Sequence, residues 1–254
     1  GKPFSQKHHQ KPDWPAEMWQ RYWRWYAACT EKVDKLIGEI VSELICGGYG
    51  TNTWIIFTAD HADSSGEHGL PFKGPWMYDG VLRVPLIVIP PQMRFCGKGR
   101  AAGSSYEPFK PRRTSRLTSL IDLVPTFMDL ARIEPDPSLP GKSLIPAVNG
   151  DDRGGHEAIF AEWHQSGKFV SPIRTVRTTT HKYSEYLGYG EESYDLQSDP
   201  LEMRNLAADT QWGTALGSLR TRLREHLKRT RDPFLTYAPT DPAGTLLRRE
   251  ENAL

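Results

Sequence analysis

Several features that mark specialised classes of protein are missing from this sequence of 254 residues. Neither sign of charge is in excess: 32 Lys and Arg stand against 31 Asp and Glu, for a net charge of +1, so composition gives no reason to expect nucleic acid as a partner. No apolar run approaches the roughly 18–20 residues of a membrane-spanning helix. What is left is a globular chain, long enough for one large domain or for a domain with a smaller companion.

Cysteine is scarce, and its spacing is uninformative. The three cysteines are Cys29, Cys46 and Cys96. An odd number without a CxxC spacing predicts neither a disulfide framework nor a zinc knuckle. Aromatic residues are plentiful by comparison, because eight Trp and ten Tyr supply large pieces for a core.

The first half of the chain has the patterns of a long helix and of buried strands. Apolar residues recur at three- and four-residue steps between Pro15 and Gly47, which predicts one helix. Five aromatic residues near its start either pack in a core, as their helical spacing favours, or form a stacking platform. They are Trp19, Tyr22, Trp23, Trp25 and Tyr26. Continuous apolar runs at 54–58 and 85–90 predict strands buried on both faces, as in a parallel sheet between helices.

The pattern changes after residue 150. Before that point, a helical pair or a kinked helix is expected at 116–131. After it, short runs separated by turn residues predict antiparallel strands. These runs are 158–163, 173–178, 182–187 and 192–196. A helix at about 209–230 has leucines on one face, and the tail after it is expected to be extended or disordered. The predicted organisation is therefore an α/β part at 1–150, a small antiparallel-sheet subdomain at 151–230 and a tail at 231–254.

The loop after the first predicted strand concentrates residues that can do chemistry. In open α/β sheets, ligands bind outside the carboxyl ends of the strands, where Asp60 and His61 stand. An Asp oxygen and a His nitrogen can supply part of a divalent cation site, and the Lys73 ammonium can bind the oxygens of a tetrahedral oxyanion. His68 could protonate a leaving group. Singly, such residues are more often helix caps or solvated side chains, but their run directly after a buried strand is more specific.

Motifs along nearly the whole chain resemble those of the type I sulfatases of the alkaline-phosphatase superfamily. Residues 52–61, NTWIIFTADH, are similar to the family's NTxxxFTSDHG, and GEHG, KG and RVPLI follow as in the family. The motifs DLVPT at 122–126, GKSL at 141–144, IRT, KY and YDLxxDPxExxNL at 194–206 then come in the family's order. The resemblance implies an α/β fold: a partial alkaline-phosphatase-like mixed sheet between helices, then a small α+β domain with an antiparallel sheet and a packing helix.

The resemblance also implies roles for single residues. Asp60 and His61 would be two ligands of the catalytic divalent cation, usually Ca²⁺. Lys73 would contact the sulfate ester oxygens, both binding substrate and stabilising charge in catalysis. His68 would lie at the rim of the catalytic site. His9, within His8-His9-Gln10-Lys11-Pro12, resembles a substrate-facing histidine of the family, with a surface loop as the alternative.

Two departures from the family pattern affect the predicted loop conformation and the expected activity. Ala62 replaces a glycine, which would cost roughly 1 kcal/mol if that position has a positive φ. The larger departure is that the nucleophile, a formylglycine made from Cys or Ser in C/S-x-P-x-R, has no match around any of the three cysteines. The paired aspartates that complete the metal shell are also missing. The expectation is therefore the C-terminal part of a sulfuric ester hydrolase, with its nucleophile upstream and no turnover by itself.

Two alternative functions are considered beside the sulfatase. One is a phosphodiester or phosphonate monoester hydrolase of the same superfamily. The other is a non-catalytic polyanion-binding module, suggested by basic residues at 110–116 and in the last helix, although 31 acids make solvated faces the better reading. The expected partners are a sulfated small molecule or carbohydrate and the N-terminal portion of the enzyme, without nucleic acid or a membrane span. The family favours a periplasmic or extracellular location over a lysosomal one.

Overall fold

The computed structural model describes residues 12–91, 111–166 and 169–236. Contacts group the described residues into two compact units. One unit holds 61–83 together with the residues from 115 onward, and the other holds 13–60 and 84–114, so far as these are described. The domain boundary predicted at residue 150 stays a prediction.

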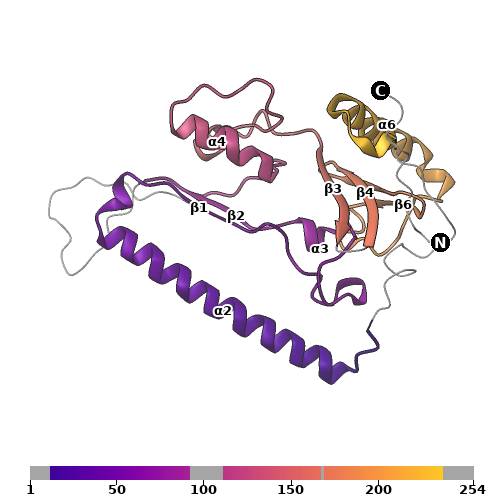
Figure 1. The fold of residues 1–254 in the computed structure, drawn as a ribbon, viewed down its shortest axis with the longest axis horizontal. Coiled ribbons are helices and arrows are strands. Elements are labelled where there is room, and N and C mark those ends of the chain that lie inside the picture. The colour runs from indigo at the N-terminus through magenta and orange to yellow at the C-terminus, as the bar shows by residue number, and fades with distance from the viewer. Residues whose placement is uncertain (1–11, 92–110, 167–168, 237–254) are drawn as a thin grey trace. The chain divides into compact units, whose positions relative to one another are not determined.

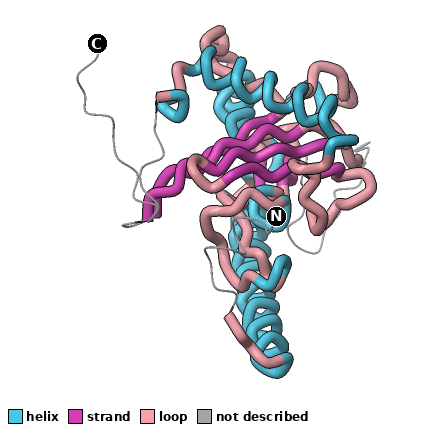
Figure 2. Tube along the Cα trace, turned by 90° about the vertical axis from the view of Figure 1, so that its right-hand side faces the viewer, coloured by secondary structure: helices cyan, strands magenta, loops and turns pink. Residues whose placement is uncertain are grey.

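The first unit is built on a four-stranded antiparallel sheet in the order β3-β4-β5-β6 (Figures 1 and 2). Its strands are β3 (Ile159–Ser166), β4 (Phe169–Arg177), β5 (His181–Tyr186) and β6 (Gly190–Asp195). Neighbouring strands follow each other in the sequence, as expected for a chain that turns back at short connections such as 178–180 and 187–189. The prediction of antiparallel strands is confirmed.

Helix α6 (Gly213–Thr230) covers one face of this sheet (Figure 2). Its four leucines recur at three- and four-residue steps and form a core with Val176 and Tyr183 of the sheet. They are Leu216, Leu219, Leu223 and Leu227. The short helix η5 (Pro233–Leu235) closes this core, since Phe234 is buried in the same cluster. The expectation of an extended tail is therefore wrong for these residues, and the residues from 237 on lie outside the described ones.

Residues 61–83 belong to the same unit and pack on the sheet. They contain η2 (Glu67–Gly69) and α3 (Asp79–Leu82). Leu70, Trp76, Tyr78 and Val81 are buried with Tyr194 of β6. The segment before the sheet adds η3 (Leu120–Asp122), α4 (Leu123–Leu130) and α5 (Ile145–Val148).

The second unit contains α2 (Ala16–Cys46), η1 (Tyr49–Thr51), β1 (Ile55–Thr58) and β2 (Leu86–Ile89). The long helix and both strands form where the sequence predicts them. The two strands pair antiparallel, however, and both are only partly buried, so the expected parallel arrangement is wrong for this pair. A continuous apolar run can identify a strand, but not the direction of its partner.

The aromatic residues of α2 differ from their expected core packing. Tyr22 is buried, whereas Trp23 and Trp25 are 48% and 60% exposed. Trp19 contacts both Tyr22 and Trp23 through its ring, so the side chains cover one another rather than entering a core. Helical spacing shows which residues share a side of a helix, but not whether another segment covers that side.

Two further sequence-level expectations concern cysteines and membrane spans. Cys46, the last residue of α2, is disulfide-bonded, whereas Cys29 is free and exposed. The cysteine spacing gave no sign of this bond, because spacing does not show which thiols meet in space. Within the described residues, no helix combines the length and the apolar character needed to cross a membrane.

Candidate active-site loop

The two predicted metal ligands follow directly after β1. The strand ends at Thr58, and Asp60, an exposed residue, is followed in the chain by the partly buried His61. Their side chains offer an oxygen and a nitrogen donor, which suits part of a divalent cation shell. Calcium takes six to eight oxygen ligands, and among the described residues no group of three or more His, Cys, Asp and Glu side chains could hold a metal ion. The donors fit a partial shell, and their assignment as ligands stays a prediction.

His61 and Lys73 are brought together although twelve residues separate them in the chain. The Nζ atom of Lys73 lies 2.6 Å from Nε2 of His61. An ammonium can only donate, so Nε2 offers its lone pair in this contact. The Nε2 lone pair is therefore taken up by the ammonium, and a cation bound at Nε2 would have to take the place of that ammonium.

The backbone of Lys73 is held by a neighbouring acid. Asp63 accepts a hydrogen bond from the Lys73 backbone N–H at 3.0 Å. One residue further on, a Cβ added to Gly74 would lie 2.2 Å from the ring of Trp76, which is buried and donates its indole N–H to Ser64 at 2.9 Å. Glycine at 74 thus lets the chain pass close to a fixed indole, leaving the Lys73 side chain exposed at the loop surface.

His68 lies inside the loop rather than at its surface. Its side chain is 6% exposed, and its ring stacks on Tyr78 with centroids 3.7 Å apart and planes 8° from parallel. Its φ of 54° is in the left-handed region, which is unfavourable for a residue with a Cβ and persists when the surroundings hold it. This geometry gives His68 a packing role, and its predicted role at the rim of the catalytic site stays a prediction.

The alanine in place of the family's glycine is accommodated without strain. Ala62 is not among the residues with a positive φ. Its backbone N–H donates to the carbonyl of Val81 at 2.9 Å, which joins the start of the loop to its end. His9 lies outside the described residues, so its predicted contact with substrate is not placed.

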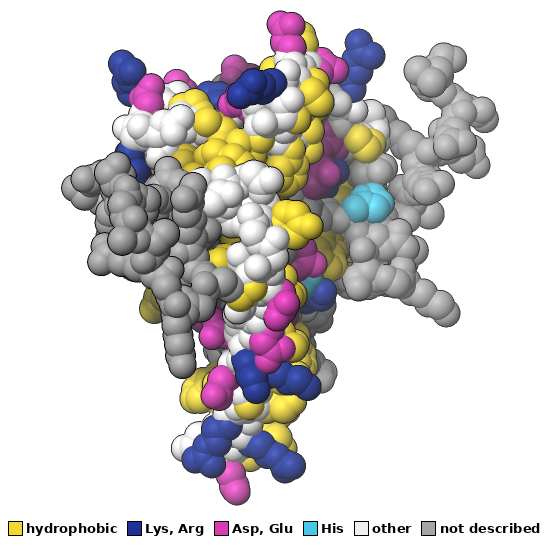
Figure 3. Space-filling model, turned by 90° about the vertical axis from the view of Figure 1, so that its left-hand side faces the viewer, with side chains coloured by type: hydrophobic (Ala, Val, Ile, Leu, Met, Phe, Trp, Pro, Cys, Tyr) yellow, Lys and Arg dark blue, Asp and Glu magenta, His cyan; other side chains and the backbone are white. Residues whose placement is uncertain are grey.

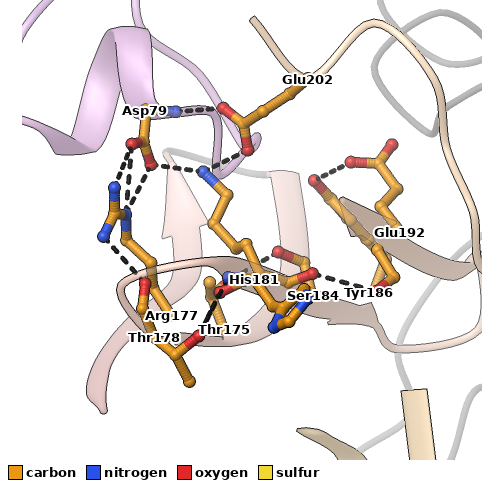
Figure 4. Close-up of polar contacts among 11 residues, drawn as sticks. Asp79, Thr175, Arg177, Thr178, His181, Ser184, Tyr186, Glu192 and Glu202 are labelled. Atoms are coloured by element: carbon orange, nitrogen blue, oxygen red, sulfur yellow. Dashed lines mark hydrogen bonds and ion pairs between the residues drawn. The ribbon is translucent and has the colours of Figure 1, made fainter. Parts of the chain in front are cut away.

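Four charged side chains from three separate segments meet where the loop packs on the sheet (Figure 4). Lys182 of β5 pairs with both Asp79, at 2.8 Å, and Glu202. Arg177 of β4 lies 2.9 Å from Asp79. The side chains of Lys182 and Glu202 are 1% and 2% exposed, so the charges are compensated by one another rather than by water.

The pKa values in this cluster follow from that pairing. Burial alone would raise the pKa of Asp79, but the charges and hydrogen bonds of Lys182 and Arg177 outweigh it and lower the pKa from 3.8 to about 2. Burial raises the pKa of Glu202, against the opposing effect of Lys182. Sequence reasoning gave these four residues no role. Lys182 and Glu202 stand within motifs shared with the sulfatases, and that was the available signal.

Three basic residues of α6 form ion pairs with acids of the same chain. Arg220 lies 2.6 Å from Glu191, Arg222 lies 3.2 Å from Glu157, and Arg224 lies 2.8 Å from Glu185. On the face drawn in Figure 3, Lys and Arg side chains lie among Asp and Glu side chains. The three ion pairs of α6 leave less unpaired positive charge on that helix for a polyanion, which supports the interpretation of these residues as balanced faces.

Solved structures of a sulfatase and of a phosphonate monoester hydrolase match this structure, and they place it in the alkaline-phosphatase-like fold class. A family model described as "N-sulphoglucosamine sulphohydrolase, C-terminal" matches residues 66–231. The match extends over more than half of the sequence, and the chain belongs to this family.

Relatives and solved structures agree with the family. Delta 4,5-hexuronate-2-O-sulfatase of Bacteroides thetaiotaomicron is 31% identical over 228 residues, which are 89% of this chain and 45% of that protein. The structure of a 2-O GAG sulfatase matches with a TM-score of 0.79 at 29% identity, covering 91% of this chain and 48% of that one. Phosphonate monoester hydrolase of Agrobacterium radiobacter matches with a TM-score of 0.66 at 26% identity, covering 86% and 44%. The chain thus spans about half the length of the proteins it matches.

Proposed function

We propose that this chain is the C-terminal part of a sulfatase that hydrolyses sulfuric esters. The observation that carries the proposal is the family match over 66–231, joined to a loop in which Lys73 reaches His61. The enzyme uses a divalent cation, which we propose to be Ca²⁺, and a formylglycine on sequence upstream of this chain. When bound, these groups supply positive charge and the nucleophile.

The residues of this chain bind and orient. Asp60 and His61 would hold the cation, Asp60 through a carboxylate oxygen and His61 through a ring nitrogen. Lys73, with its backbone held by Asp63, places its ammonium on the sulfate oxygens and stabilises the charge that grows on them. His68 and His9 are the candidates for contacts at the rim of the catalytic site, where a histidine would protonate the departing alcohol.

We further propose that the substrate is a sulfated carbohydrate. The 2-O-sulfatase and the 2-O GAG sulfatase that resemble this chain carry that chemistry in their names. A panel of sulfated disaccharides, with an aryl sulfate for comparison, tests this in the enzyme expressed with its upstream sequence. Higher kcat/KM on the disaccharides is expected, and turnover of the aryl sulfate alone would contradict the substrate class.

Removal of the Lys73 ammonium tests the proposed chemistry most directly. In the enzyme expressed with its upstream sequence, Lys73→Ala should lower kcat/KM for a sulfate ester by about 10²–10³-fold, as for other groups that stabilise developing charge. Lys35→Ala is the matched control, because Lys35 is another exposed lysine, on α2, with no proposed role. Equal activity of both variants would refute the assignment of Lys73.

The metal assignment has its own measurement. Asp60→Ala should weaken calcium binding to the enzyme expressed with its upstream sequence, as measured by calorimetry, and unchanged affinity would refute the ligand role. The 254-residue chain alone should bind calcium weakly or not at all, because two donors are far fewer than calcium requires.

A phosphonate monoester hydrolase is the second candidate function. It is favoured by the match to the solved phosphonate monoester hydrolase. Both functions can use the same metal ligands and lysine, because sulfate and phosphonate esters both present tetrahedral oxygens. Comparing hydrolysis of matched sulfate, phosphate and phosphonate esters separates them, and faster turnover of a phosphorus ester would overturn the first proposal.

A further inference from the structure

The cluster of Asp79, Arg177, Lys182 and Glu202 joins the candidate loop to the C-terminal sheet (Figure 4). Asp79 is the first residue of α3, and both its side chain and its backbone are engaged. Its carboxylate accepts hydrogen bonds from Lys182 at 2.8 Å and from Arg177 at 2.9 Å. Its backbone N–H donates to Glu202 at 2.6 Å. One residue is thus held from three directions by strands β4 and β5 and by the turn after β6.

A short path of covalent bonds and one backbone hydrogen bond leads from this anchor to His61. Asp79 is two residues from Val81, whose carbonyl accepts the backbone N–H of Ala62 at 2.9 Å. Ala62 directly follows His61, whose Nε2 meets the Lys73 ammonium. A shift of α3 would therefore move the carbonyl that holds the start of the loop, and with it the imidazole.

Glu202 is built into this arrangement at a conformational cost. Its φ of 58° is in the left-handed region, where a side chain with a Cβ is disfavoured. Such conformations persist when the surroundings over-determine them, and they concentrate at sites where geometry matters. The strained backbone and the burial of the carboxylate both show that this side chain is held at one position beside Lys182 and the Asp79 backbone.

We infer that Asp79, Arg177, Lys182 and Glu202 are positioning residues that couple the C-terminal sheet to the loop bearing His61 and Lys73. The sheet is then more than a support for the fold, because it sets the place of the loop through α3. The value of this coupling for hydrolysis rests on the proposed function. The coupling itself does not depend on the proposed function, because it can be measured without substrate or metal.

Amide hydrogen exchange of the 254-residue chain, followed by NMR, tests this coupling. The quantity is the protection of the Ala62 amide relative to the slowest amides of β5, which report opening of the sheet. Glu202→Gln removes one charge but keeps the side-chain shape, and it should lower this ratio about tenfold, as for the loss of a charge-assisted contact. Arg177→Gln, at a more exposed position, should lower the ratio less, by about threefold.

The matched control is another ion pair of low exposure in the same unit. Arg174 and Asp232 pair at 2.7 Å with 7% and 9% of their side chains exposed, and they join β4 to the segment after α6. Asp232→Asn should destabilise the sheet and leave the ratio unchanged. A ratio unchanged in both cluster variants, or lowered equally in the control, would overturn the proposal. Should Glu202→Gln fail to fold, Arg177→Gln and its control carry the test by themselves.

The nitrogen signals of the imidazoles give a second readout. The Lys73 contact fixes which nitrogen of His61 carries the proton, so the ¹⁵N shifts of that ring report its position. These shifts should move in Glu202→Gln and stay in place in Asp232→Asn. A merely stabilising role of the cluster would leave the folded-state shifts of His61 untouched in both variants.

Discussion

The sheet unit and the unit built on α2 differ in how far the apolar side chains of their long helices are exposed. In the sheet unit, the leucines of α6 are 4% exposed or less and pack against Val176, Tyr183 and Phe234. On α2, Val33, Leu36 and Ile40 are 53%, 48% and 67% exposed. Both helices have an apolar side with helical spacing, yet the leucines of α6 pack on the sheet of their unit, whereas these three side chains of α2 stay exposed. A helical pattern therefore does not by itself supply a core.

This difference predicts which parts of the described chain are stabilised by the burial of apolar side chains. Burial of a leucine side chain contributes about 1.5–3 kcal/mol, and this contribution is lost where the side chain stays in water. The stability of the isolated chain should thus come mainly from the sheet, α6 and the loop at 61–83. The following predictions compare matched positions in the two units, starting with the largest expected effect.

Truncation of one leucine in each helix should have very different effects. Leu223→Ala leaves a cavity at a position 1% exposed and should lower the free energy of unfolding by about 3 kcal/mol. Leu36→Ala, at a position 48% exposed, should change it by less than about 0.5 kcal/mol. Denaturant unfolding followed by circular dichroism measures both. Similar losses would show that α2 is covered in solution.

Acid should destabilise the sheet unit through Asp79. Its pKa of about 2 in the folded chain lies below the ordinary 3.8, so its ionised form stabilises the fold above about pH 5 and this stability is lost as the pH falls towards 2. The difference corresponds to about 2 kcal/mol. Asp79→Asn should lack this part of the pH dependence. Comparing wild type with Asp79→Asn between pH 6 and pH 2.5 isolates it, because other carboxylates titrate in both proteins.

The raised pKa of Glu202 has the opposite effect on stability in acid. The folded chain binds this proton more tightly than the unfolded chain does, so protonation of Glu202 raises the free energy of unfolding as the pH falls through the raised value. The wild type therefore loses less stability in acid than Asp79 alone would cause. Parallel curves for wild type and Asp79→Asn would contradict the low pKa of Asp79.

Two glycines offer a comparison with opposite signs. A Cβ at Gly74 would meet the buried ring of Trp76 at 2.2 Å, so Gly74→Ala should cost about 1–2 kcal/mol. A Cβ at Gly38, within α2, would meet nothing within 4 Å, so Gly38→Ala should stabilise the helix by about 0.5–1 kcal/mol. Thermal unfolding gives the sign of each change. Stabilisation by Gly74→Ala would show that the loop has room to move.

The smallest expected effect concerns the cysteines of α2. It is a difference in their reactivity towards an alkylating reagent and not a change in stability. Iodoacetamide added without a reductant should modify Cys29, which is free and exposed, but not Cys46, which is disulfide-bonded. Mass mapping of the digested protein reads this directly. Alkylation of Cys46 in the untreated protein would contradict the bond.

Much of the local structure was predictable, for local reasons. The limits of α2, the strands of the sheet and the leucine side of α6 all follow from periodicity and turn residues. The candidate loop was identified from chemistry-bearing residues after a strand. What could not be predicted is the 2.6 Å approach of Lys73 to His61, or the stacking of His68 on Tyr78, because both depend on how the loop folds back on itself.

Most of the helices and strands, and the family motifs, can be predicted from the amino-acid sequence alone. The tertiary structure brings Lys182 and Glu202 together with Asp79 inside the molecule. The sequence around these two charged residues gives no sign that they are buried. The tertiary structure also decided that α6 is covered while much of the apolar side of α2 is exposed. The physical reason is the same in both cases. Periodicity is a property of neighbours along the chain, whereas burial and ion pairing depend on residues far away in sequence.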